Sequence, residues 1–97
     1  MIKQLTEDSF ASAIRRLPDL TSFQQIQKIY EEINELKDAY IVDAHIGHYV
    51  SIHCRKLTAV EEELADVILS CLVFAKCENI DIEKALKIKN EFNKTRK

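Results

Sequence analysis

Four carboxylates, arranged as two pairs at helical spacing, are the residues of this chain best suited to chemistry. Glu32 and Glu35 are three residues apart in one segment, and Glu63 and Asp66 are three apart in another. Residues three apart lie on one face of a helix, so each pair presents two carboxylates together. Asp66 is the one charged residue within the apolar stretch 64–75, where an unpaired ion is costly. Each pair is therefore a candidate half of a divalent-cation site.

The two pairs would face each other if their segments pack as antiparallel helices. Four converging carboxylates repel one another and raise one another's pKa values, and a divalent cation relieves this repulsion. An all-oxygen ligand set suits Mg²⁺, with Mn²⁺ as an alternative. We therefore predict that the metal ligands are Glu32, Glu35, Glu63 and Asp66.

A basic and polar stripe near the end of the sequence complements these acids. Lys89, Asn93 and Arg96 follow the i, i+4, i+7 spacing of one helix face. Cations there suit the oxygens of a phosphate group, and arginine makes forked contacts with them. The simpler interpretation is a charged helix end stabilised by the helix dipole. We predict that the three side chains bind the phosphates of a substrate beside the metal.

Composition indicates one all-α domain. With one glycine, one proline and no tryptophan among 97 residues, the chain has almost no punctuation for strands and hairpins. We predict a single domain over residues 1–97, an antiparallel bundle of about four helices, with an N-terminal helix in 1–20 and the acidic and basic helices in 21–97. The net charge of -2 gives no reason to expect nucleic acid or a membrane as a partner.

Capping signals place the helix ends. Thr21 with Gln24 and Thr58 with Glu61 fit capping boxes that begin the second and third helices. The second helix is expected to reach residue 40 or continue as far as Ile46, and the third to end near residue 78. The first helix is expected to begin at residues 6–8 and stop before Pro18, while Asp81 caps the fourth, whose packing side would be Ile82, Ala85, Leu86 and Phe92. Residues 43–57 are expected to form an irregular or helical connector.

The cysteines and histidines favour a reduced, cytoplasmic protein without a zinc site. Three cysteines with no Cys-x-x-Cys spacing are expected to be free thiols, and no signal peptide is evident. The longest apolar stretch, of about 12 residues, is too short for a membrane span. The spacing of His45, His48, His53 and Cys54 fits no familiar zinc pattern, so we expect surface or interface histidines.

Taken in order, three motifs resemble one family: Glu31-Glu32-x-x-Glu35, Glu63-x-x-Asp66, and Lys89-x-x-x-Asn93-x-x-Arg96. They are similar to those of the MazG-type nucleoside triphosphate pyrophosphohydrolases, in the all-α NTP pyrophosphatase superfamily. The resemblance covers residues 22–97 apart from the connector at 41–57. It implies Mg²⁺-dependent cleavage of a (deoxy)nucleoside triphosphate into a monophosphate and pyrophosphate, by a homodimer or homotetramer with sites shared between chains.

The resemblance also implies roles for particular side chains. Mg²⁺ would be held by the two carboxylate pairs, with Glu31 in an outer or second-metal role. Metal-assisted phosphoryl transfer needs a base for the attacking water, and either Glu31 or Glu62 would serve.

Two other functions stay open on the sequence alone. The chain would be a non-catalytic helical module that binds metal or a partner, or an enzyme similar to the phosphoribosyl-ATP pyrophosphohydrolases, which share the scaffold. In each case we expect self-association, because a short bundle has too few helices to cover the apolar stretch 64–75 on all sides.

Overall fold

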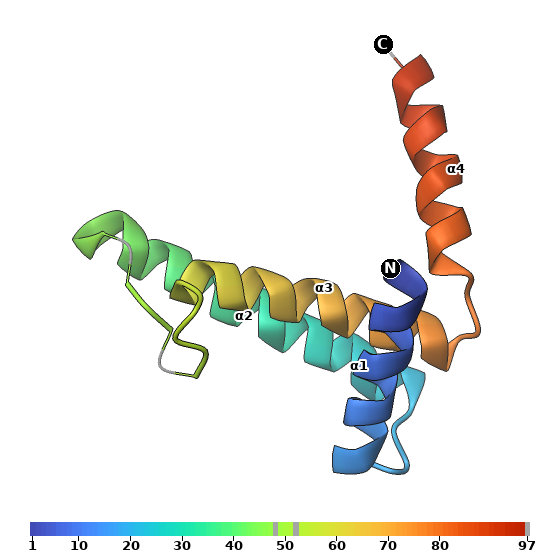
Figure 1. The fold of residues 1–97 in the computed structure, drawn as a ribbon, viewed down its shortest axis with the longest axis horizontal. Helices are drawn as coiled ribbons and strands as arrows, with labels where there is room; N and C mark the ends of the chain where they lie inside the picture. The colour runs from blue at the N-terminus through green and yellow to red at the C-terminus, as the bar shows by residue number, and fades with distance from the viewer. Residues whose placement is uncertain (48, 52, 97) are drawn as a thin grey trace.

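The computed structural model describes residues 1–47, 49–51 and 53–96, and they form four helices. These are α1 (Ile2–Arg16), α2 (Ser22–Ile46), α3 (Ala59–Cys77) and α4 (Ile82–Thr95) (Figure 1). Within the described residues the β structure is limited to one isolated antiparallel bridge, between Val50 and Thr58. The predicted all-α fold of four helices is confirmed.

The antiparallel pair of α2 and α3 is the scaffold of the molecule. The side-chain amide of Gln25 donates to the carbonyl oxygen of Ser70 at 2.9 Å, while Glu32, further along α2, meets Asp66, earlier in α3. Small side chains let the helices approach closely. The buried apolar residues are Ala13, Ala39, Ala59, Leu72, Val73 and Ala75. The helix α1 lies across one end of this pair and packs mainly on α3 (Figure 1).

Both predicted capping boxes are present. Thr21 accepts from the backbone N–H of Gln24, and Thr58 does the same for Glu61, while each glutamine or glutamate side chain accepts from the capping residue's own N–H. The second helix takes the longer of its two predicted extents. It stops before Gly47, whose φ of 84° lies in the left-handed region that favours glycine.

The predicted start of the first helix at residues 6–8 is wrong. The helix begins at Ile2, and the backbone N–H of Leu5 already donates to the carbonyl of Met1 at 3.0 Å. Thr6 is not a cap, because its hydroxyl donates back to the carbonyl of Ile2 at 2.7 Å inside the helix. The sequence of a threonine followed by two acids is typical of a helix start, but here it lies inside a helix that has already begun one turn earlier.

The fourth helix extends away from the α2–α3 pair (Figure 1). Asp81 caps it as predicted, accepting from the N–H of Lys84 at 3.1 Å. Of its predicted packing side, Ile82 is half-buried, whereas Ala85, Leu86 and Phe92 are exposed. No residue of α4 is buried, and its contacts with α1 are few. The helical spacing of apolar residues correctly predicted an apolar side of α4, but nothing within the described part of the chain covers that side.

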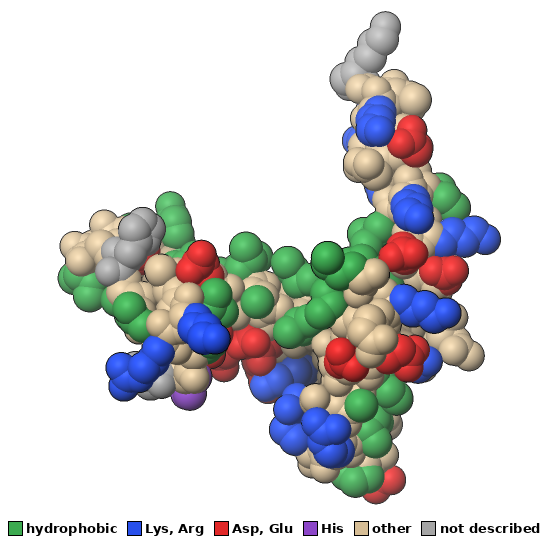
Figure 2. Space-filling model, in the orientation of Figure 1, with side chains coloured by type: hydrophobic (Ala, Val, Ile, Leu, Met, Phe, Trp, Pro, Cys, Tyr) green, Lys and Arg blue, Asp and Glu red, His purple; other side chains and the backbone are tan. Residues whose placement is uncertain are grey.

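A continuous apolar surface on α2 and α3 is also uncovered. We call this surface the exposed apolar face, and it comprises Phe23, Ile26, Tyr30, Ile33, Tyr40, Leu64, Ile68 and Cys71. The view in Figure 2 has green apolar side chains along the upper edge of the α2–α3 pair and red acidic ones below them. Within one chain the apolar stretch 64–75 is not covered on all sides. No helix among the described residues is long and apolar enough to cross a membrane.

Candidate metal centre

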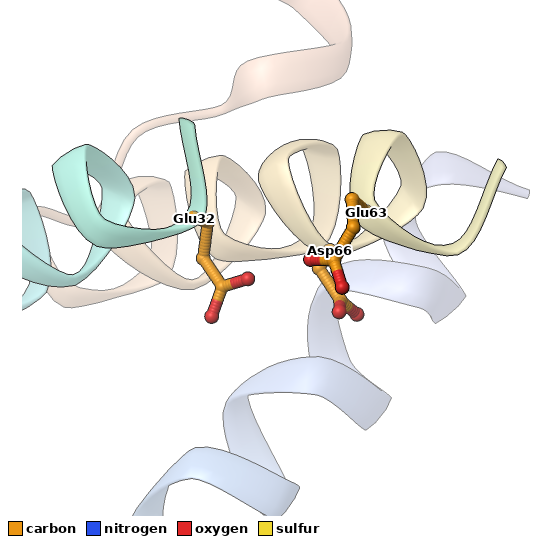
Figure 3. A group of neighbouring side chains, drawn as sticks. All are labelled: Glu32, Glu63 and Asp66. Atoms are coloured by element: carbon orange, nitrogen blue, oxygen red, sulfur yellow. The ribbon is translucent and has the colours of Figure 1, made fainter. Parts of the chain in front are cut away.

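Three of the four predicted metal ligands converge at the middle of the α2–α3 pair. Glu32 comes from α2, Glu63 and Asp66 come from α3, and each offers a carboxylate oxygen within 4.8 Å of the other two (Figure 3). The antiparallel packing brings residues 31 or more positions apart in sequence to one place. All three side chains point to the same side of the pair, the side on which α1 lies (Figure 3). We call these three residues the carboxylate cluster.

The carboxylate cluster contains two buried oxygens without hydrogen-bond donors. Glu32 is 6% exposed, and its Oε2 atom has no partner among the described residues; the same holds for Oε2 of the half-buried Glu63. A buried acceptor that lacks a donor costs about 1–3 kcal/mol, and more when it is charged. A donor or a cation at these oxygens would remove this cost.

Burial and mutual repulsion raise the pKa values of two members of the cluster, Glu63 and Asp66. Burial first, and then the charges of Glu35 and Asp66, raise the pKa of Glu63 to about 7. Burial and the charge of Glu32 raise the pKa of Asp66 above its ordinary value. The carboxyl group of Glu63 therefore keeps its proton to a higher pH than an ordinary glutamate does.

Glu35, the fourth predicted ligand, lies at the rim of the cluster. Its side chain is exposed, but burial of its carboxyl group and the charge of Glu32 still raise its pKa. Its carboxyl group also interacts directly with that of Glu63. Glu35 is thus coupled to the cluster without belonging to the closest group of three.

Lys28 supplies the positive charge nearest to the cluster, and the sequence analysis missed it. Its Nζ atom lies 3.0 Å from Oε1 of Glu32 and 3.8 Å from Oε2 of Glu31. The hydrogen bond with Glu32 raises the pKa of Lys28. The i, i+4 spacing of Lys28 and Glu32 was the available signal.

The connector between α2 and α3 contributes to the site through Glu62. The hydroxyl of Ser51, a buried residue, donates to Oε2 of Glu62, and Nδ1 of His53 lies 3.9 Å from the same oxygen. The Ser51 hydroxyl also accepts from the backbone N–H groups of His53 and Cys54. The connector therefore fixes the orientation of a carboxylate that adjoins the cluster, a role that its sequence did not reveal.

The remaining predicted site residues lie elsewhere. Glu31 is exposed and touches Lys28 rather than the cluster. Lys89 and Asn93 are exposed on α4, and Arg96 is exposed at its C-cap, one residue beyond the helix. The helix leads away from the α2–α3 pair (Figure 1). Lys89 and Arg96 lie over the ring of Phe92, 4.7 and 5.8 Å from its centroid. One chain does not bring its basic stripe to its own carboxylates.

The donor set of the carboxylate cluster fits a hard divalent cation. It consists of oxygens alone, as Mg²⁺ and Mn²⁺ prefer, with no thiolate or imidazole to favour zinc. The two oxygens without donors would gain the partner that they lack. Among the described residues this is the one group of three or more potential ligands; His45, His53 and Cys54 do not form another, and His48 lies outside those residues.

Comparison with protein-family models, curated proteins and solved structures finds no match. The functional interpretation therefore rests on the geometry of the cluster and on the motifs of the sequence.

Proposed function

We propose that this protein is a Mg²⁺-dependent nucleotide pyrophosphohydrolase, which cleaves a (deoxy)nucleoside triphosphate into a monophosphate and pyrophosphate. The observation that carries the proposal is the convergence of Glu32, Glu63 and Asp66, with a buried oxygen of Glu32 that has no donor. The resemblance of the three motifs to MazG-type enzymes supplies the reaction.

The cluster is the proposed holding site for the ion. Glu32, Glu63 and Asp66 would bind it, and Glu35 at the rim would complete the set. When bound, Mg²⁺ would neutralise charge on the triphosphate and lower the pKa of a water molecule. The pKa values of Glu63 and Asp66 are raised, so Mg²⁺ and protons would compete for the same carboxylate oxygens. Binding of the ion would therefore require these two carboxyl groups to lose their protons.

Glu62 is the better placed of the two candidate bases. It is half-buried, its orientation is fixed by Ser51, and its charge is felt by both Glu63 and Asp66. Glu31 has none of these features. In the proposed reaction Glu62 takes a proton from water, the water oxygen bonds to the α-phosphorus, and the bond from that phosphorus to the bridging oxygen breaks. Pyrophosphate leaves with the electron pair.

We further propose that the active particle is a homodimer or homotetramer built through the exposed apolar face. Large apolar side chains, such as Phe23 and Tyr30, are about two-thirds exposed in one chain, and contiguous patches of this kind mark interaction surfaces. In such a particle the basic stripe of α4 would act at the carboxylate cluster of another chain.

Product analysis tests the reaction. The protein is incubated with Mg²⁺ and a panel of canonical and modified ribo- and deoxyribonucleoside triphosphates, together with phosphoribosyl-ATP. We expect monophosphate and pyrophosphate, and loss of turnover in Asp66→Asn with unchanged circular dichroism. Asp38→Asn, an exposed residue of the same charge on α2, is the matched control and should keep full activity.

Other products would identify the alternatives. Formation of diphosphate and orthophosphate would contradict the proposed cleavage position. Full activity of Asp66→Asn would show that the carboxylate cluster does not take part in the reaction. Binding of Mn²⁺ without turnover of any compound in the panel would favour the non-catalytic metal-binding module.

A further inference from the structure

A cleft of about 500 Å³ is lined by residues of α1, α2 and α3 and includes part of the carboxylate cluster. Glu32 and Asp66 form part of its wall, Lys28 stands beside them, and Arg16 approaches from the last turn of α1. Its volume falls within the usual range for small-molecule sites, about 300–1,000 Å³. The view in Figure 3 has the side chains of the cluster pointing toward α1, across this space.

Arg16 is the uncommitted cation of this cleft. Within the described part of the chain it makes neither an ion pair nor a hydrogen bond, whereas Lys28 is held by Glu32 at 3.0 Å. Arg16 and Lys28 also line a second hollow, of about 310 Å³. A free guanidinium that borders two hollows can meet an anion in either of them.

The charges of the cleft are arranged for an anion that carries a metal. Three carboxylates line the cleft, with Asp8 on α1 in addition to Glu32 and Asp66. The two cations of the lining are Arg16 and Lys28. A metal ion alone would need the carboxylates only, and a metal-free anion would be repelled by them. A polyphosphate chelated to a divalent cation satisfies both groups at once.

We propose that this cleft binds the triphosphate chain of the substrate and that Arg16 grips its phosphate oxygens. The inference rests on the proposed function and deepens it, because it assigns a substrate contact to α1, which the sequence motifs do not include. Each chain then contributes its own phosphate-binding cation beside its own carboxylate cluster.

Arg15 provides a matched control on the same helix turn. Both arginines lie in the last turn of α1 and interact equally with the helix dipole. Arg15, however, donates to Oγ of Ser12 at 3.1 Å and lines neither hollow. A difference between Arg16→Gln and Arg15→Gln therefore reports the cleft and not the helix end.

The experiment is a calorimetric titration of the full chain with inorganic tripolyphosphate in saturating Mg²⁺, with a separate Mn²⁺ titration of each variant. We expect Arg16→Gln to raise the Kd for tripolyphosphate about tenfold or more, consistent with the loss of a charge-assisted contact. Arg15→Gln should stay within about twofold of wild type, Arg16→Lys should recover part of the loss, and Mn²⁺ affinity should stay unchanged in all three.

Three results would overturn the proposal. Unchanged tripolyphosphate affinity in Arg16→Gln would contradict binding of the triphosphate in this cleft, but it would not contradict the proposed function. Equal losses of tripolyphosphate affinity in Arg15→Gln and Arg16→Gln would mean that positive charge at the end of α1, and not a contact in the cleft, causes the effect. Wild-type protein that binds Mn²⁺ but no tripolyphosphate would overturn the cleft and the proposed function together.

Discussion

Lys28 is the counter-ion of the carboxylate cluster in the metal-free chain, since its ammonium lies 3.0 Å from the buried Glu32. Replacing it by methionine leaves that carboxylate buried and unpaired. We expect Lys28→Met to lower the free energy of unfolding by about 1–3 kcal/mol without metal. Mg²⁺ should stabilise the variant more than wild type, because the ion no longer competes with the ammonium. Thermal unfolding with and without Mg²⁺ measures both effects.

Lys37→Met is the control for this prediction. Lys37 is exposed on the same helix and makes no ion pair in the described part of the chain. Its replacement should change neither stability nor the response to Mg²⁺. A smaller Mg²⁺ stabilisation in Lys28→Met than in wild type would show that Lys28 organises the ligands and does not compete with the ion.

Glu63 gives the metal-free protein a characteristic pH dependence. Its pKa is about 7 in the folded chain against an ordinary 4.5, so the folded state binds more protons between these values. Its contribution to stability is therefore fully present below pH 4.5 and declines as pH rises to about 7, by up to about 3 kcal/mol. Denaturant unfolding in EDTA at pH 5–8 measures this decline, and comparison with Glu63→Gln isolates it.

Mg²⁺ should reverse this trend, because metal binding requires deprotonated carboxylates. The stabilisation by Mg²⁺ should increase from pH 5 to pH 8 in wild type. If wild type and Glu63→Gln showed parallel pH profiles without metal, the high pKa of Glu63 would be contradicted.

The convergence of Glu32, Glu63 and Asp66 was predictable from the sequence, because helical spacing and antiparallel packing suffice to place them. Arg16 and the contact of Ser51 with Glu62 were not predictable. They depend on how α1 crosses the pair and how an irregular connector folds back, and neither follows from a period in the sequence.

At the scale of elements, Thr58 links the start of α3 to the geometry of the site. It caps the helix just before Glu62, in the first turn, and Glu63, the residue that follows it. We expect Thr58→Ala to cost about 1 kcal/mol of stability. It should also weaken Mn²⁺ binding, because fraying of the first turn displaces Glu63. Chemical denaturation and a Mn²⁺ titration measure the two effects.

Thr21→Ala is the matched control, since a capping box of the same type begins α2 about three turns before Glu32. It should cost a similar amount of stability and leave Mn²⁺ affinity unchanged. Equal losses of metal affinity in both variants would mean that global stability, and not the position of Glu63, determines binding.

Helix ends were predictable wherever a side chain caps the backbone, as at Thr21, Thr58 and Asp81. The start of α1 was not, because Met1 makes no side-chain cap bond there. The course of α4 was not predictable either: the period identifies an apolar side, but it does not say which surface covers that side.

At the scale of the whole molecule, the exposed apolar face predicts self-association. Ile68, which lies on α3 at the centre of this face, is 50% exposed. We expect Ile68→Asp to shift the protein from an oligomer toward a monomer and to raise the dissociation constant at least about tenfold, since a charge would be buried at the contact. Light scattering over a concentration series measures the shift.

Leu17→Asp tests whether any added charge has this effect, because Leu17 is 43% exposed but lies outside the exposed apolar face. It should leave the oligomer intact. Wild-type protein that stays monomeric at micromolar concentration would contradict association through this face.

The outward course of α4 would have a genetic consequence. If its basic stripe serves only the site of a neighbouring chain, two inactive alleles would complement each other. A chain with Asp66→Asn keeps a sound α4, and a chain with Arg96→Ala keeps a sound cluster. Co-expressed, they would assemble mixed particles in which one site in two receives both intact halves. Activity would then reappear in cells that carry no functional copy of the gene.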